Sequence, residues 1–124
     1  MGKRLHVVSK QREYGKSEGF NWKFEEFKDF LEDLGADVCA VEDCTDEFEC
    51  DEYSYKEILN MLKDYKENGM TDKVKEFLIQ HNYKETKFIN DLDNLGGLDE
   101  VVDIMQRFYD ERDKNSEWIQ FVAF

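Results

Sequence analysis

The two ends of the chain have the sequence pattern of β-strands, and helical patterns fill the sequence between them. The segment Arg4–Ser9 contains the β-branched pair Val7 and Val8, and Glu117–Phe124 is rich in aromatic and β-branched residues. A single strand cannot satisfy its own backbone N–H and C=O groups, so the two terminal segments are expected to pair. The sequence therefore predicts one small sheet that joins both ends of the chain.

Five segments between the ends have apolar residues at helical spacing. We expect helices over residues 22–34, 54–67, 71–81, 88–95 and 98–113. Asn21 is expected to cap the first helix, Ser54 with Glu57 the second, and Thr71 the third. Short strands are expected at Asp37–Val41 and around Phe48.

The fold class that follows is α+β, a helix-rich single domain over residues 1–124. About five helices would pack on a small sheet that includes the N- and C-terminal strands. A composition of 40% hydrophobic and 15% aromatic residues is enough to build one core, although 38% of the residues are charged. The polar segment Lys10–Gly19, which contains Gly15, Ser17 and Gly19, is expected to be a loop.

Charge is distributed unevenly along the chain, whose formal net charge is -13. Six basic and two acidic residues give residues 1–23 a charge of +4, whereas thirteen acids and one lysine give residues 24–52 a charge of -12. An acidic molecule is not expected to bind nucleic acid or an anionic membrane directly. No apolar run approaches the roughly 18 residues of a membrane helix, and the start lacks the apolar stretch of a secretion signal. We expect a cytoplasmic protein.

Three cysteines lie close together in the sequence, at Cys39, Cys44 and Cys50. Their odd number does not fit a secreted disulfide framework, and their spacing lacks the C-x2-C pair of structural zinc sites. Free thiols are therefore expected, and a zinc site completed by His6 is the alternative.

No motif predicts catalytic, cofactor-binding or metal-ligating residues. The segment Asp91–Gly96 begins like a calcium-binding EF-hand loop, but Leu95 and Val102 occupy positions that need oxygen ligands. The C-terminal position of His81 in its expected helix favours a structural role.

The first expected helix departs from the usual arrangement of charges. Asp29, Glu32 and Asp33 lie in its C-terminal half, where they oppose the helix dipole, and only Lys28 offsets them. Such local inconsistency tends to mark function, although a solvated acidic face is the simpler explanation. The candidate interaction residues are Glu25, Asp29, Glu32, Asp33, Asp43, Asp46 and Glu47.

A second candidate surface is the basic N-terminal loop, with Lys10, Arg12, Tyr14, Lys16 and Trp22. This loop either contacts a partner or docks within the molecule against the acidic segment after Val41.

These features predict a non-enzymatic acidic module that binds a protein partner. Between Glu25 and Asp33 five acids and one lysine span about 12 Å, a net charge every ~3 Å, against one per ~1.7 Å of duplex DNA. An inhibitor or nucleic-acid mimic that acts on a basic, nucleic-acid-handling protein fits this density. In composition alone the chain resembles host-defence inhibitors that phages and mobile elements encode. The alternative is a small enzyme or ligand-binding protein with a pocket near the N-terminal loop.

Overall fold

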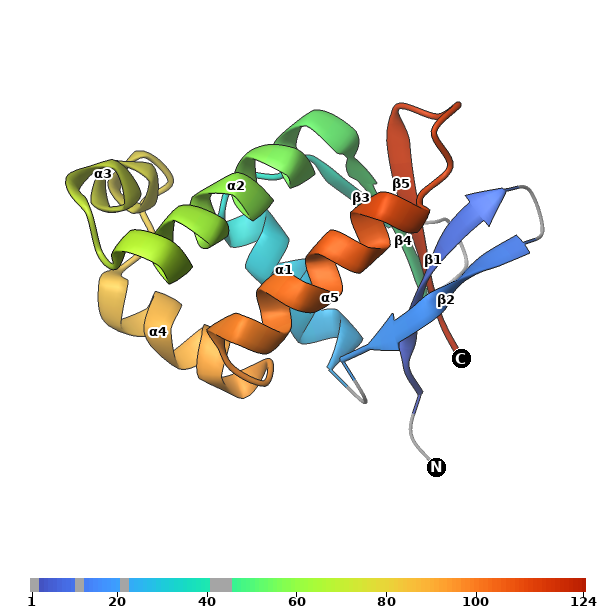
Figure 1. Cartoon of the computed structure of the whole chain (residues 1–124), viewed down its shortest axis with the longest axis horizontal. Coiled ribbons are helices and arrows are strands. Elements are labelled where there is room, and N and C mark those ends of the chain that lie inside the picture. The colour runs from blue at the N-terminus through green and yellow to red at the C-terminus, as the bar shows by residue number, and fades with distance from the viewer. Residues whose placement is uncertain (1–2, 11–12, 21–22, 41–45) are drawn as a thin grey trace.

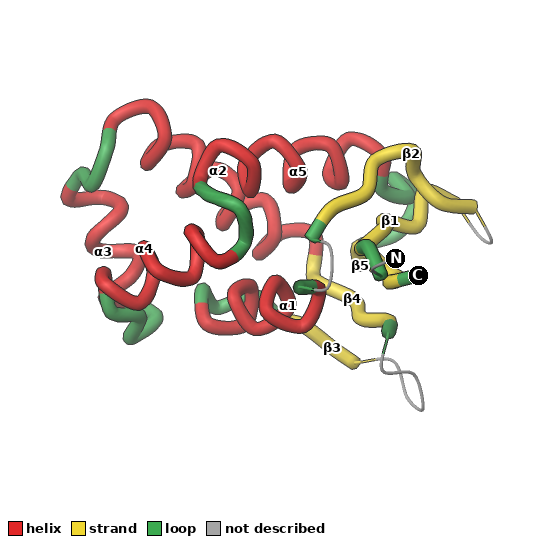
Figure 2. The backbone as a smooth tube through the Cα atoms, turned by 90° about the horizontal axis from the view of Figure 1, so that it is seen from below, coloured by secondary structure: helices red, strands yellow, loops and turns green. Residues whose placement is uncertain are grey.

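The computed structural model describes residues 3–10, 13–20, 23–40 and 46–124, and these form one α+β domain (Figure 1). The strands are β1 (Leu5–Lys10), β2 (Glu13–Gly19), β3 (Val38–Ala40), β4 (Glu47–Asp51) and β5 (Trp118–Ala123). The helices are α1 (Phe24–Asp33), α2 (Glu52–Asn68), α3 (Asp72–Gln80), α4 (Glu85–Asn94) and α5 (Leu98–Glu111). All five helices lie on the same side of the sheet, and α3 and α4 are the farthest from it (Figures 1 and 2).

The sheet is antiparallel, with the strand order β2-β1-β5-β4-β3. The prediction that the two ends of the chain pair is confirmed, because Val7 of β1 lies opposite Phe121 of β5. Phe121 also lies opposite Phe48 of β4. The C-terminal strand is thus the central strand of the sheet.

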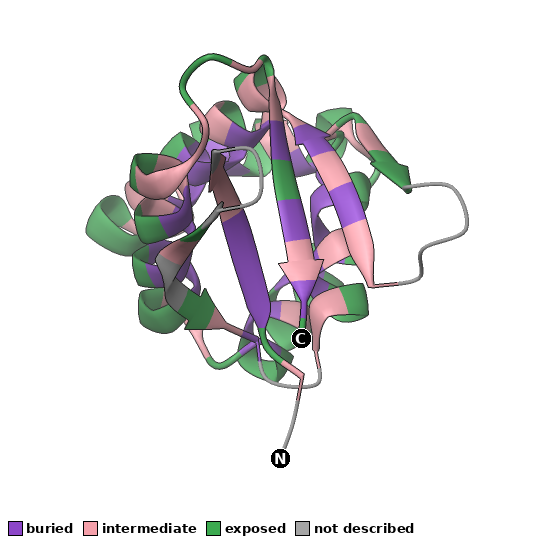
Figure 3. Cartoon of the chain, turned by 90° about the vertical axis from the view of Figure 1, so that its right-hand side faces the viewer, coloured by how far each residue is buried: buried purple, intermediate pink, exposed green. Residues whose placement is uncertain are grey.

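The core lies between the sheet and the helices. Along β5 the residues Ile119, Phe121 and Ala123 are buried, and the residues between them face the side without helices (Figure 3). The ring of Phe121 packs against those of Phe27, Phe48, Tyr55 and Phe108. Because each aromatic side chain buries a large apolar area, this cluster joins α1, α2 and α5 to the middle of the sheet.

The expectation of a loop over Lys10–Gly19 is wrong, because residues 13–19 form strand β2. Its glycines allow α5 to approach the strand closely. A Cβ atom at Gly19 would lie 2.8 Å from Cγ2 of Ile104, and one at Gly15 would lie 3.0 Å from Cβ of Glu111, both residues of α5. The segment is polar because β2 is an edge strand with one face open to solvent.

The expected caps of the helices are only partly right. Thr71 does cap α3, since its hydroxyl accepts a hydrogen bond from the Val74 N–H at 3.3 Å. Helix α2, however, begins earlier than predicted, and Asp51 is its cap in place of Ser54; the Asp51 carboxylate accepts from the Ser54 N–H at 2.9 Å. Strand β4 therefore passes directly into α2. The predicted cap Asn21 lies outside the described residues.

No helix in the described part of the chain combines the length and the apolar character that a bilayer crossing requires.

Candidate interaction surface

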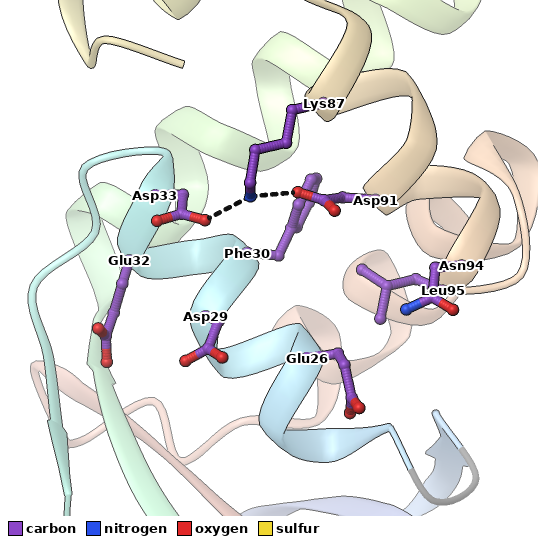
Figure 4. Close-up of a pocket in the computed structure, with 9 residues that line it drawn as sticks. All are labelled: Glu26, Asp29, Phe30, Glu32, Asp33, Lys87, Asp91, Asn94 and Leu95. Carbon is purple, nitrogen blue, oxygen red and sulfur yellow. Dashed lines mark hydrogen bonds and ion pairs between the residues drawn. The ribbon is translucent and has the colours of Figure 1, made fainter. Parts of the chain in front are cut away.

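A groove of about 300 Å³ runs between α1 and α4, and we call it the acidic groove (Figure 4). Its lining residues are Glu26, Asp29, Phe30, Glu32 and Asp33 from α1, Lys87, Asp91 and Asn94 from α4, and Leu95 directly after α4. Five carboxylates and one ammonium group therefore meet in it.

Buried aromatic residues hold the two walls of the groove together. The apolar stripe of α1, with Phe27, Phe30 and Leu31, faces the core, so the acidic side chains of the helix point away from it. The Phe30 ring stacks on the Phe88 ring of α4 at a centroid distance of 6.0 Å, and it forms an edge-to-face contact with the Tyr83 ring at a centroid distance of 6.3 Å. These packed aromatic side chains thus hold the acidic residues of α1 at a fixed distance from those of α4.

Polar contacts tie the two helices at both ends of the groove. Lys23, which directly precedes α1, donates a hydrogen bond to the side-chain oxygen of Asn94 near the end of α4. At the other end the Lys87 ammonium lies 3.2 Å from the Asp33 carboxylate and 2.9 Å from the Asp91 carboxylate (Figure 4).

Lys87 is the internal counter-ion of the groove. Its hydrogen bond to Asp91, with a further one to Asp33, raises its pKa. The ammonium also lies 5.0 Å from the centroid of the Tyr83 ring, whose hydroxyl donates to Asp91. Burial and this carboxylate together raise the pKa of Tyr83. Lys87 thereby supplies the positive charge that the last turn of α1 lacks.

The other carboxylates of the groove are weakly neutralised. Lys28 lies 3.8 Å from Glu32, and Glu26 and Asp29 make no ion pair with any residue that the structure describes. All three acids are exposed. The groove therefore keeps most of its negative charge.

The structure brings together only some of the predicted acidic residues. Asp29, Glu32 and Asp33 line the acidic groove, whereas Glu25 is exposed and does not line it. Asp46 pairs with Lys3 at 2.8 Å, and Glu47 lies opposite Val122 in the sheet. Asp43 lies outside the described residues.

The basic candidates of the N-terminal region are described only in part. Tyr14 is on β2, is 49% exposed, and contacts the Phe124 ring edge-on at 5.1 Å. Lys10 and Lys16 belong to β1 and β2, but their side chains lie outside the described part, as do residues Arg12 and Trp22 entirely. Whether they dock within the molecule or bind a partner stays a prediction.

His6 is buried on the face of the sheet that no helix covers. Its ring stacks on the Phe124 ring at 3.9 Å, and its Nε2 atom lies 3.2 Å from the Glu18 carboxylate. The Arg4 guanidinium also bonds to Glu18, and this bond, followed by the one from His6, lowers the pKa of that carboxyl. Phe124 therefore covers the imidazole.

The described cysteines lie in two different environments. Cys39 is exposed, whereas Cys50 is buried, and burial raises the pKa of the Cys50 thiol to about 12. Among the described residues no group of three or more His, Cys, Asp or Glu side chains is arranged to hold a metal ion. Cys44 lies outside those residues.

Sequence reasoning missed three of the charged residues that line the acidic groove. Glu26 could have been found, because it lies three positions before Asp29 and seven before Asp33 on one helix face. Lys87 and Asp91 had no local signal, since only the packing of α4 on α1 brings them to this groove.

Comparisons of the chain with protein-family models, with curated proteins and with solved structures gave no match.

Proposed function

We propose that this protein is a cytoplasmic binding module, not an enzyme, and that its acidic groove binds a basic protein that normally handles nucleic acid. The observation that carries the proposal is the groove itself, in which five carboxylates face one ammonium group between two helices held by buried aromatic residues. Lysine and arginine side chains of a partner would replace the missing counter-ions, and an arginine can bond to two carboxylate oxygens at once.

The fixed geometry of the groove favours binding over a merely solvated acidic face. Glu26 and Asp33 are seven residues apart, or about 10 Å along the helix at about 1.5 Å per residue. The density of negative charge along this helix is of the same order as that of a nucleic-acid backbone. A field of this kind accelerates association with a basic surface, and salt weakens it.

The described N-terminal residues provide no observation that favours the alternative, a small enzyme or ligand-binding protein with a pocket near the basic segment. The His6 imidazole is covered by Phe124 and bonded to Glu18.

The test neutralises the acidic groove with the triple change Asp29→Asn, Glu32→Gln and Asp33→Asn. Because a polycation is attracted to any acidic protein, the matched control carries Glu67→Gln, Asp72→Asn and Glu76→Gln, three exposed acids outside the groove. We expect the affinity for a labelled hexa-arginine peptide, measured by fluorescence anisotropy, to fall about tenfold in the groove variant and about twofold in the control. Equal losses in both would show that net charge alone attracts the peptide.

Affinity capture from the native cell then tests the class of partner. The wild-type protein and the control variant should recover the same basic protein, identified by mass spectrometry, and the groove variant should not. Recovery of an acidic partner, or equal recovery by all three proteins, would contradict the proposal.

A further inference from the structure

A second groove, between α2 and α3, differs from the acidic groove in its chemistry. It encloses about 430 Å³, and its apolar lining is formed by the buried Met61 and Val74 and the half-buried Phe77. We call it the apolar groove. Its rim consists of Glu57, Asn60 and Asp64 from α2, Lys73 and Gln80 from α3, and His81 directly after α3.

The spacing of residues in both helices explains why this apolar surface remains open. On α3 the side chains of Val74 and Leu78 are fully packed, whereas Phe77 lies off this buried stripe. The Phe77 ring contacts the His81 ring at 4.9 Å. On α2 Met61 is only 7% exposed, so the open apolar surface of the groove is mainly that of Phe77.

A third hollow connects the apolar groove to the acidic groove. It encloses about 470 Å³ and is lined by Glu32, Asp33, His81, Asn82, Tyr83, Lys84 and Lys87. His81 also belongs to the apolar groove, and Glu32, Asp33 and Lys87 also belong to the acidic groove. The three hollows thus follow one another over the surface.

The junction at His81 is tightly fitted. Gly35, after the end of α1, has a φ of +88°, and a Cβ atom there would lie 2.2 Å from the His81 ring. Only glycine allows this close approach, so the C-terminal ends of α1 and α3 are held against each other. The acidic groove and the apolar groove therefore keep a fixed distance and orientation relative to each other.

The charge of the lining residues changes from the acidic groove through the third hollow to the apolar groove. The acidic groove has five carboxylates against one ammonium group, the third hollow has two of each, and the apolar groove has two carboxylates against Lys73. A complementary segment would be basic at one end, polar and uncharged in the middle, and apolar at the other end. The size of the apolar groove is within the range of sites that hold a small ligand or a large side chain.

We propose that the apolar groove binds a large apolar side chain of the same basic partner that occupies the acidic groove. This inference rests on the proposed function. The recognised segment of the partner is then bipartite, with lysine or arginine residues separated by a short polar linker from one aromatic or large aliphatic anchor. The basic part supplies attraction, and the anchor supplies specificity through its fit.

The test uses labelled hexa-arginine peptides joined to one tryptophan by a Gly-Ser linker of about two, four, six or eight residues, the range of short flexible linkers. One set of peptides carries the linker and the tryptophan at the N-terminus, and the other set carries them at the C-terminus. In the matched peptides serine replaces the tryptophan. We expect at least one linker length to give about tenfold tighter binding than its serine partner. In the variant Asn60→Trp, which fills the apolar groove from its exposed rim, this gain should disappear while binding of plain hexa-arginine is unchanged.

The outcomes separate the two proposals. If no tryptophan peptide binds more tightly than its serine partner, or if the gain survives in Asn60→Trp, the apolar groove is not the anchor site, and the acidic groove stands. If hexa-arginine binds the protein no better than it binds the groove-neutralised variant, the proposed function itself fails.

Discussion

Lys87 shows how one residue sets the charge of the acidic groove. It neutralises Asp33 and Asp91 and lies over the ring of Tyr83. In the function that we propose, it occupies the position that a partner's cation would take. The side chain is exposed, and exposed ion pairs contribute about 1 kcal/mol or less to stability. Its larger effect is therefore expected on binding.

We predict that Lys87→Gln lowers the free energy of unfolding by about 1 kcal/mol at most and strengthens hexa-arginine binding by about threefold. Urea denaturation and fluorescence anisotropy measure the two quantities. Lys75→Gln is the matched control, because Lys75 is exposed on α3 and lies outside the groove. An equal gain in both variants would show that Lys87 does not compete with the peptide.

Glu18 gives the N-terminal part of the sheet a dependence on pH. Its folded-state pKa lies below the ordinary value of 4.5, chiefly because of the hydrogen bond from Arg4. A lowered pKa contributes stability that is fully present above about pH 4.5 and is lost as the pH falls through the folded-state value.

Replacement of Glu18 by Gln should therefore lower the melting temperature at pH 7, and the difference from wild type should shrink as the pH falls below about 4.5. Thermal melts followed by circular dichroism from pH 7 to pH 3 measure this. The variant Glu67→Gln controls for the loss of one exposed charge. If the melting temperatures of Glu18→Gln and wild type differ by the same amount from pH 7 to pH 3, the stability does not depend on the protonation of Glu18.

At the scale of elements, the close packing of α5 on β2 decides that residues 13–19 are a strand. Gly19 contributes no side chain, so Ile104 of α5 can lie against its Cα atom. This polar, glycine-containing segment pairs with β1 and packs against α5, and these contacts outweigh its low strand propensity.

We predict that Gly19→Ala destabilises the protein by about 1 to 3 kcal/mol, since the added Cβ would lie 2.8 Å from the buried Ile104 side chain. Urea denaturation gives the value. In the double variant with Ile104→Ala, which removes the Cγ2 and Cδ1 atoms that the new Cβ would meet, the total loss should be smaller than the sum of the two single losses, which a double-mutant cycle detects. Additive effects of the two changes would mean that the clash is relieved elsewhere.

For the whole molecule, the central position of β5 makes the last residues decisive. Removal of residues 118–124 would separate β1 from β4 and take Phe121 out of the core. The loss of one buried aromatic side chain alone costs about 3–5 kcal/mol, against a total stability of about 5–15 kcal/mol for a typical protein.

This truncated protein should show no cooperative thermal transition by circular dichroism. Removal of Phe124 alone is the control, because this residue is 57% exposed and lies beyond β5, so that variant should still melt cooperatively. A cooperative transition at the wild-type temperature after loss of all seven residues would contradict the central role of β5.

The α+β class and the acidic character of α1 follow from the residue pattern alone, because strand and helix patterns and charge depend on residues close in the chain. The pairing of the two ends also follows from the sequence, because a single strand cannot satisfy its own backbone groups and both ends have strong strand patterns. The predicted cap of α2, Ser54, is wrong because Asp51 is both the last residue of β4 and the cap of α2. Tertiary packing makes β2 a strand, places β5 in the centre of the sheet and brings Lys87, which is 54 residues from Asp33, to the acidic groove. These depend on contacts between distant segments, above all Phe30 on Phe88 and Ile104 on Gly19, which no local pattern encodes.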